Sequence, residues 1–141
     1  MRLSSLAASV AAAALAYAAA PSHAFDDDQF CVAAKEFVRS AAGDVGTWTD
    51  RFTRNDGVEI GCDLKTVHFK RFYKAPASAL RDGWQERQAE GWENATCTRS
   101  IWRDAVSNGW VVSATVTTAG GERVWLACLP DGRGFYRVLP R

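Results

Sequence analysis

The chain contains two cysteine-to-cysteine segments of the same length, and this repetition restricts its fold more than any other feature. The first runs from Cys31 to Cys62 and the second from Cys97 to Cys128, each thirty-two residues long with no cysteine inside. A shift of 66 residues superimposes both cysteines and six further identities, and the match continues past the second cysteine. Self-similarity at a fixed period indicates an internal repeat.

Residues 1–24 have the pattern of a cleaved signal peptide. Arg2 supplies a positive start, an alanine-rich apolar stretch follows, and Ser22 and Ala24 fit the small-x-small pattern of a cleavage site. The apolar run is shorter than the roughly 20 residues that span a bilayer. We therefore expect a periplasmic or secreted protein whose mature chain, residues 25–141, is a single α+β domain without a transmembrane segment.

The cysteines are expected to form two disulfides, because an exported chain meets an oxidising compartment. Four cysteines permit three pairings, and sequence alone does not choose between them. The duplication favours Cys31–Cys62 and Cys97–Cys128, each joining a helix to the middle strand of its own small sheet. No metal site is expected, because no Cys-x-x-Cys occurs and His68 is the one histidine after the leader.

Both segments show the same order of periodicities. Apolar residues at helical spacing come first and end at a glycine, Gly43 or Gly109. Alternating residues then predict a hairpin with its turn at residues 55–57 or 120–121, and a further strand follows. The predicted fold is therefore a pair of tandem α-β-β-β units that share one core and one antiparallel sheet.

The repeat units span about 26–76 and 92–141, and the stretch between them predicts a helical connector over about 77–91. Ser78 could cap a short helix there. Gly83 and Gly91 weaken a continuous helix, so we expect a bend near Gly91.

Composition excludes general nucleic-acid binding. Without the leader, which carries Arg2 and no acid, 16 basic residues face 16 acidic ones, whereas phosphate binding requires a basic excess. No glycine-rich phosphate loop or nucleophile elbow occurs, so no cofactor is expected.

A basic and aromatic strand in the first unit is the most unusual local feature. It has a partner in the second unit, and two such strands could hold a carboxylated or phosphorylated ligand, such as an anionic glycan, a lipid headgroup or an acidic protein face. Lysine and arginine on edge strands also prevent aggregation between sheets, which is the competing explanation. The candidate binding residues of the two strands are His68, Lys70, Arg71, Tyr73, Lys74 and Arg137.

The six tryptophans exceed what a core of this size usually holds. Trp110 is expected in the core. Trp84 and Trp92 flank glycines in the connector, and Trp125 alternates out of phase with its apolar neighbours, so these three are expected to be partly exposed and to anchor a partner.

These features predict a binding protein without catalytic activity. Its partner would be an envelope or secreted protein, which it could inhibit or adapt, or an anionic ligand. A small hydrolase or isomerase that uses His68 with a nearby aspartate is one alternative. A structural protein that self-associates through exposed strands is another.

Overall fold

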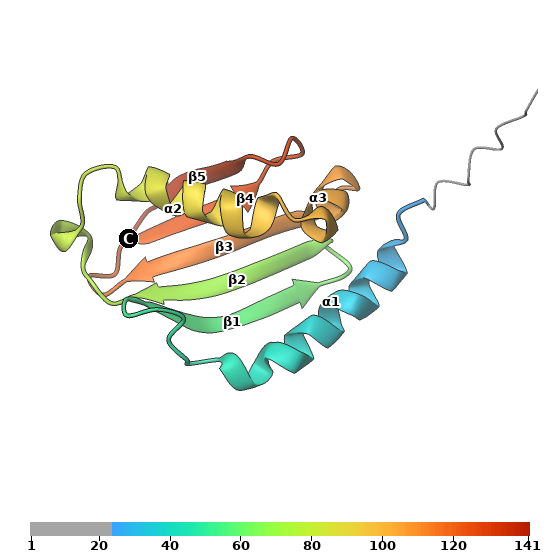
Figure 1. Cartoon of the computed structure of the whole chain (residues 1–141), viewed down its shortest axis with the longest axis horizontal. Helices are drawn as coiled ribbons and strands as arrows, with labels where there is room; N and C mark the ends of the chain where they lie inside the picture. The colour runs from blue at the N-terminus through green and yellow to red at the C-terminus, as the bar shows by residue number, and fades with distance from the viewer. Residues whose placement is uncertain (1–23) are drawn as a thin grey trace, which may run out of the picture.

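The structure is a computed structural model that describes residues 24–141, so the predicted signal peptide lies outside the described residues except for Ala24. Five strands form one mixed sheet in the order β1-β2-β3-β4-β5 (Figure 1). Their bounds are β1 Thr53–Gly61, β2 Thr66–Tyr73, β3 Val111–Thr118, β4 Arg123–Cys128 and β5 Gly134–Leu139.

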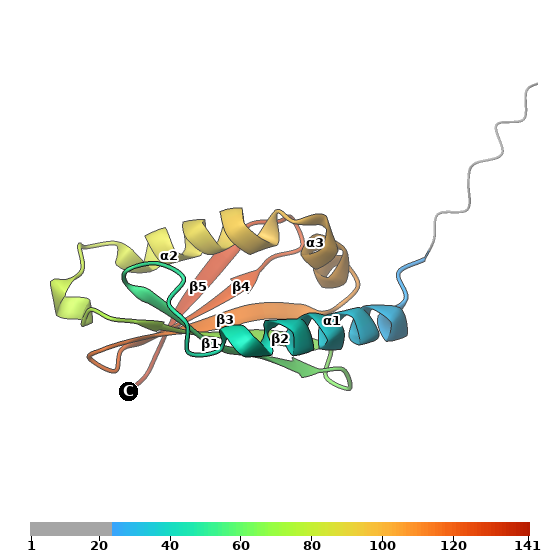
Figure 2. The same ribbon diagram turned by 60° about the horizontal axis from the view of Figure 1, so that its bottom comes forward.

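The helices gather on one face of this sheet. Figure 2 shows α2 and α3 lying over it and α1 running beside β1 and β2. The bounds are α1 Asp27–Ala41, α2 Trp84–Trp92 and α3 Ser100–Ser107, with the π-helical turn η3 Glu93–Cys97 between α2 and α3 and single turns η1 Ala42–Asp44 and η2 Ala77–Ala79. No helix of residues 24–141 covers the opposite face.

Strand alternation places the core between the sheet and the helices. Val67, Val112 and Leu126 are fully buried on the helical face. On α1, Phe30 packs edge-on against Trp110, with ring centroids 4.6 Å apart, so this helix belongs to the same core. Trp110 lies in the core as predicted.

Local chemistry fixes where α1 begins. The Asp26 side chain accepts a hydrogen bond from the Gln29 amide, which caps the helix. Asp27 accepts a hydrogen bond from the Trp110 indole at 2.8 Å and pairs with Lys65 at 2.6 Å. These two hydrogen bonds, first that from Lys65, hold the pKa of the Asp27 carboxyl below its ordinary value.

Both predicted disulfides are present. Cys31 of α1 is bonded to Cys62, which follows β1, and Cys97 of η3 is bonded to Cys128 at the end of β4. The Cα atoms are 5.8 and 5.2 Å apart. Each bond joins a helical segment to a strand, although β1 is an edge strand and only β4 is the middle strand of three.

The tandem α-β-β-β repeat is not confirmed, because the first unit contributes two named strands and the second three. The turn predicted at residues 55–57 is a bulge inside β1, where the register with β2 shifts between Asn55 and Gly57. The Asn55 side chain accepts the Gly57 amide at 3.0 Å, and Gly57 adopts a positive φ of 117°. These contacts absorb the extra residue, and the strand continues instead of reversing.

The chain reverses earlier, around Asp50. Its carboxylate accepts the amides of Phe52 and Thr53 at 2.7 and 2.8 Å, and Thr49 bonds back to Thr53. Trp48 forms only an isolated bridge with Arg54. The expected first strand of the first unit is thus reduced to this short reversal.

The sheet is mixed rather than wholly antiparallel. β2 and β3 run parallel from the Thr66–Val111 pair to the Tyr73–Thr118 pair, because the helical connection between them carries the chain back to the end where β2 began. The bend expected near Gly91 is also misplaced. Gly91 lies inside α2, which continues directly into η3, and the helical path breaks before α2, at residues 80–83, and again between η3 and α3.

Candidate functional site

Strand β2 divides its side chains between the two faces of the sheet. Phe69 and Arg71 face the helices, where Phe69 packs 5.4 Å from the Trp92 ring and the Arg71 guanidinium carbon lies 5.4 Å from the same ring centre. Tyr73 follows on the same side and stacks on Phe52 at 6.0 Å. The helical face of β2 is therefore the floor of a groove between α1 and the α2–η3–α3 segment.

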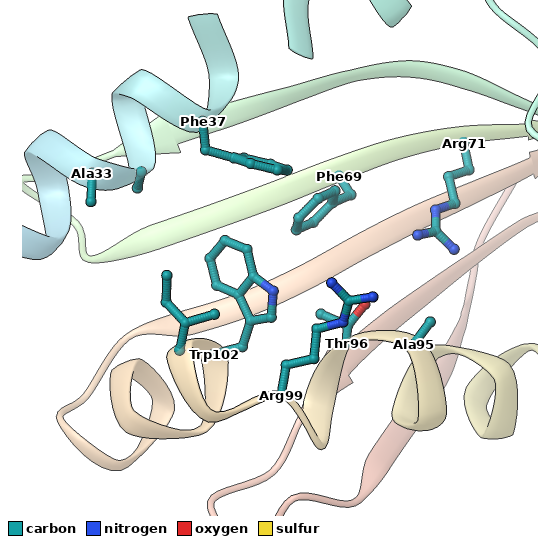
Figure 3. A pocket seen from close by; sticks show the side chains of 10 residues that line it. Ala33, Phe37, Phe69, Arg71, Ala95, Thr96, Arg99 and Trp102 are labelled. Carbon is teal, nitrogen blue, oxygen red and sulfur yellow. The ribbon is translucent and has the colours of Figure 1, made fainter. Parts of the chain in front are cut away.

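The first part of this groove is an apolar hollow of about 420 Å³. Figure 3 shows its three central rings, which come from different elements: Phe37 from α1, Phe69 from β2 and Trp102 from α3. Phe37 and Phe69 each lie 5.9 Å from Trp102. Arg71 and Arg99 both point into the hollow. Its other lining residues are Ala33, Ala34, Ala95, Thr96 and Ile101.

The second part is a hollow of about 620 Å³ on the other side of Arg71, and its lining is more polar. Asp50 and Phe52 of the chain reversal form one wall, and residues of α2 form the other. Arg71, Tyr73 and Trp92 also line it. A further hollow of about 250 Å³ adjoins Tyr73 and Trp84.

The Arg71 guanidinium carries a charge that no described residue neutralises at short range. It is half-buried and forms no ion pair or side-chain hydrogen bond with residues 24–141. Burial lowers the pKa of Arg71, and the nearby Asp50 opposes this effect. Burial acts to raise the pKa of Asp50, but the Phe52 and Thr53 amides, together with a smaller effect of the Arg71 charge, outweigh it and hold the pKa below its usual range. The Asp50 carboxylate is therefore an anion whose hydrogen bonds are made within the turn.

A second donor in the groove also lacks an acceptor. The Trp92 indole nitrogen is buried and forms no hydrogen bond within the described part of the chain. Trp92 lines the polar hollow beside Arg71. Buried donors are usually satisfied, and an unsatisfied one requires a physical reason.

The opposite face of the sheet carries His68 and Lys70. The Ser113 hydroxyl lies 2.8 Å from His68 Nδ1, and the Thr115 hydroxyl lies 2.9 Å from Nε2. Burial lowers the pKa of His68, with Glu59 opposing and Lys70 adding to the shift. Lys70 pairs with Glu59 across the β1–β2 ladder. A hollow of about 280 Å³ adjoins His68 and Lys70 on this side.

The structure therefore separates the residues that the sequence grouped together. Arg71 and Tyr73 line the groove, whereas His68 and Lys70 lie on the other face. Arg137 is also outside the groove, stacked 5.7 Å over Trp125. The Lys74 ammonium lies 5.9 Å from the Trp48 ring centre.

Of the three tryptophans that were expected to be partly exposed, the two in the connector are buried. Trp92 is 1% exposed and Trp84 is 9% exposed, because α2 lies against the sheet and turns both rings toward it. They can contact a ligand only from the groove walls. Trp125 is partly exposed, as expected.

Edge protection does not explain the basic residues of β2. This strand pairs with β1 on one side and β3 on the other, so it has no free edge. The explanation remains open for β5, which is an edge strand.

Sequence reasoning did not identify several groove residues. Phe37 was expected only as a helix face and Trp102 only as one of several aromatic residues, while Arg99, Asp50 and Arg87 were not singled out. One signal was available for Arg71: it lies in phase with Val67 and Phe69 on an alternating strand, and so shares their buried face.

Among residues 24–141, no helix is long and apolar enough to cross a membrane. Within the same range, no group of three His, Cys, Asp or Glu side chains is arranged to hold a metal ion.

Comparison with known proteins gives the fold and no activity. No protein-family model matches the chain, and no curated protein matches it. A similar fold occurs in a crystal structure, at 1.60 Å resolution, of a Pseudomonas aeruginosa protein described as a presumed secreted protein. The TM-score is 0.51 and the identity 8%, over 66% of this chain and 80% of that one. The two disulfides are compatible with an extracellular or periplasmic location.

Proposed function

We propose that this chain is an exported binding protein that holds an acidic group of its ligand at Arg71, in the groove along β2. The predicted signal peptide and the disulfides support export. A concave groove favours a ligand over a flat protein interface. The sequence predicted a broader binding surface over both basic strands, whereas the site proposed from the structure uses only one face of β2.

The observation that carries the proposal is that the half-buried guanidinium of Arg71 forms no ion pair or side-chain hydrogen bond with residues 24–141. A charge removed from water costs folding free energy unless a partner compensates it. Arg71 lies among aromatic rings and forms no ion pair with described residues, while the Trp92 indole beside it also lacks an acceptor. An anionic oxygen would complement the guanidinium, which forms strong charge-assisted hydrogen bonds with carboxylates and phosphates.

Binding is favoured over catalysis by the surroundings of His68. A catalytic base needs an oriented partner and access to a substrate. His68 has hydroxyls on both ring nitrogens, forms no hydrogen bond to an aspartate, and lies on the face away from the groove. The two hydroxyls satisfy the His68 ring, and a polar contact between β2 and β3 is enough to explain its environment.

The test compares two fluorescent probes with a similar aromatic skeleton. The probe 8-anilinonaphthalene-1-sulfonate is anionic, and N-phenyl-1-naphthylamine is neutral. We expect Arg71→Met to weaken binding of the sulfonate by roughly 10- to 100-fold, the range for losing a charged hydrogen bond, and to leave the neutral probe unaffected. Arg71→Lys should retain part of the affinity.

The matched control is Arg137→Met, because Arg137 also stacks on a tryptophan but lies outside the groove. It should change neither affinity. Equal affinity of wild type and Arg71→Met for the sulfonate would refute the proposal.

A further inference from the structure

The two hollows that meet at Arg71 differ in chemistry, and this difference gives the groove a direction. On one side, Phe37, Phe69 and Trp102 present rings to the cavity, and alanines and Ile101 complete its wall. On the other side, polar side chains such as Asp50, Arg87 and Gln88 line the larger hollow. A ligand anchored at Arg71 would therefore have an apolar part on one side and a polar part on the other.

The apolar hollow is not closed by the protein's own side chains. Phe37 is 41% exposed and Ile101 is 49% exposed, although both border a cavity whose floor is core. Exposed apolar side chains that converge on one hollow, instead of scattering, indicate a binding surface. Ala34, which also lines the hollow, is 2% exposed, and Phe69 of β2 lines it from the sheet.

We infer that the groove binds a single-chain amphiphile: Arg71 takes a monoanionic head group, and the hollow between α1 and α3 takes the apolar chain. This inference rests on the proposed function and adds the ligand class. A cavity of about 420 Å³ lies at the small end of the range for ligand sites, which suits one chain better than two. Arg99, at the mouth of the same hollow, adds a second positive charge near the head group.

A carboxylate and a phosphate share this chemistry, so the head group could belong to a free fatty acid or to a single-chain phospholipid. The experiment uses n-alkyl carboxylates, n-alkyl methyl phosphates, whose diester phosphate is monoanionic, and n-alkanols of six to twelve carbons, each below its critical micelle concentration. Isothermal titration calorimetry measures affinity for the disulfide-bonded protein. The head group that binds more tightly at equal chain length identifies the source.

For the anionic series, affinity should rise about two- to fourfold per methylene until the hollow is filled, since a buried methylene contributes up to about 0.8 kcal/mol. The alkanols should bind at least tenfold more weakly at every length. Arg71→Met should remove that preference for the anion.

Two variants test where the chain lies. Ala95→Phe fills the hollow, and Ile101→Asn makes its wall polar; both positions are exposed and should tolerate the change. In either variant, the affinity for alkyl anions should rise less steeply with chain length. Ala42→Phe, an exposed position outside the hollow at the end of α1, is the control and should keep the wild-type dependence.

The outcomes separate this inference from the proposed function. Arg71-dependent binding of anions without dependence on chain length would overturn the inference and leave the proposed function standing. Equal affinity for alkanols and anions, unchanged in Arg71→Met, would overturn both. If an acidic peptide bound in a way that depends on Arg71 and no alkyl anion bound, the inference would be overturned in favour of a protein partner.

Discussion

At the residue scale, Arg71 combines a cost in stability with the proposed role in binding. Its guanidinium is half-buried beside Trp92 without an ion-pair partner among residues 24–141. Replacing such a charge by an apolar side chain of similar length commonly stabilises a fold. We predict that Arg71→Met raises the free energy of unfolding by about 1 kcal/mol while binding is lost.

Urea unfolding followed by tryptophan fluorescence would measure this change. Arg137→Met should stay within about 0.5 kcal/mol of wild type, because its side chain is exposed. A clear loss of stability in Arg71→Met would mean that the guanidinium supports the fold, and would remove the argument that it is kept for a ligand.

His68 predicts a specific acid sensitivity. Burial lowers its pKa below the value of about 6.5 that an unfolded chain has. The unfolded state therefore binds more protons below that pH, and stability present above about pH 6.5 is lost as the pH falls toward the folded pKa. In His68→Gln, which keeps a donor and an acceptor for the Ser113 and Thr115 hydroxyls, the decline between pH 7 and 5 should be shallower.

Melting temperatures of both proteins across this pH range provide the comparison. Carboxylates that do not interact with His68 contribute equally to both slopes, so the difference reports the imidazole together with its coupling to Glu59. Parallel curves would show that the pKa of His68 is not lowered by folding.

At the element scale, α2 approaches β5 so closely that one position excludes a side chain. A Cβ atom at Gly134 would lie 2.5 Å from the Ala89 carbonyl oxygen, and the Gly134 amide donates to Glu93 at 2.7 Å. We predict that Gly134→Ala lowers the free energy of unfolding by about 2 kcal/mol, because the helix must move away from the sheet.

Gly91 provides the matched control, since it lies within α2 and a Cβ atom there meets nothing within 4 Å. Gly91→Ala should stabilise the protein by about 0.5 to 1 kcal/mol through helix propensity. Chemical denaturation of both variants tests the pair. If both substitutions changed the free energy of unfolding in the same way, the close packing of α2 on β5 would be contradicted.

The elements with a clear local signal were predictable, and those that depend on pairing partners were not. The periodicity of the first helix and the turn at Gly120–Gly121 both have a counterpart in the structure. The Asn55-Asp56-Gly57 stretch carries a strong turn signal, yet β2 pairs with both sides of it and converts it to a bulge. Local chemistry cannot reveal that partner.

At the scale of the whole molecule, the groove could not be derived from the sequence. Its rings are brought together by α1, β2 and α3, and their convergence depends on the parallel pairing of β2 with β3, which the sequence did not indicate. The disulfide pairing was accessible because equal spacing provided a rule that does not depend on the tertiary fold. The candidate residues, which were chosen by composition, consequently lie on two opposite faces of the sheet. Only the alternation of side chains along β2 distinguishes Arg71, on the helical face, from His68, on the other.

The two disulfides close loops of equal length, so their effects on the unfolded chain should be the same, about 3 to 4 kcal/mol each in the loop-entropy model. Their folded surroundings differ. Cys97 is 0% exposed and Cys128 is 9% exposed, whereas Cys31 and Cys62 lie at the margin of the core. We predict that replacing Cys97 and Cys128 with alanine lowers the free energy of unfolding more than replacing Cys31 and Cys62, by about 1 kcal/mol, since a buried cavity adds to the lost crosslink.

The location of the loss should differ as well. The Cys31–Cys62 bond holds α1 to the end of β1, and α1 is one wall of the apolar hollow. Without this bond, hydrogen exchange should accelerate in residues 27–41 while β3 and β4 stay protected, because α1 can then open without the sheet. Loss of the other bond should instead raise exchange throughout the core. Uniform exchange in both variants would show that α1 and the sheet unfold as one unit, and that the hollow has no separately mobile wall.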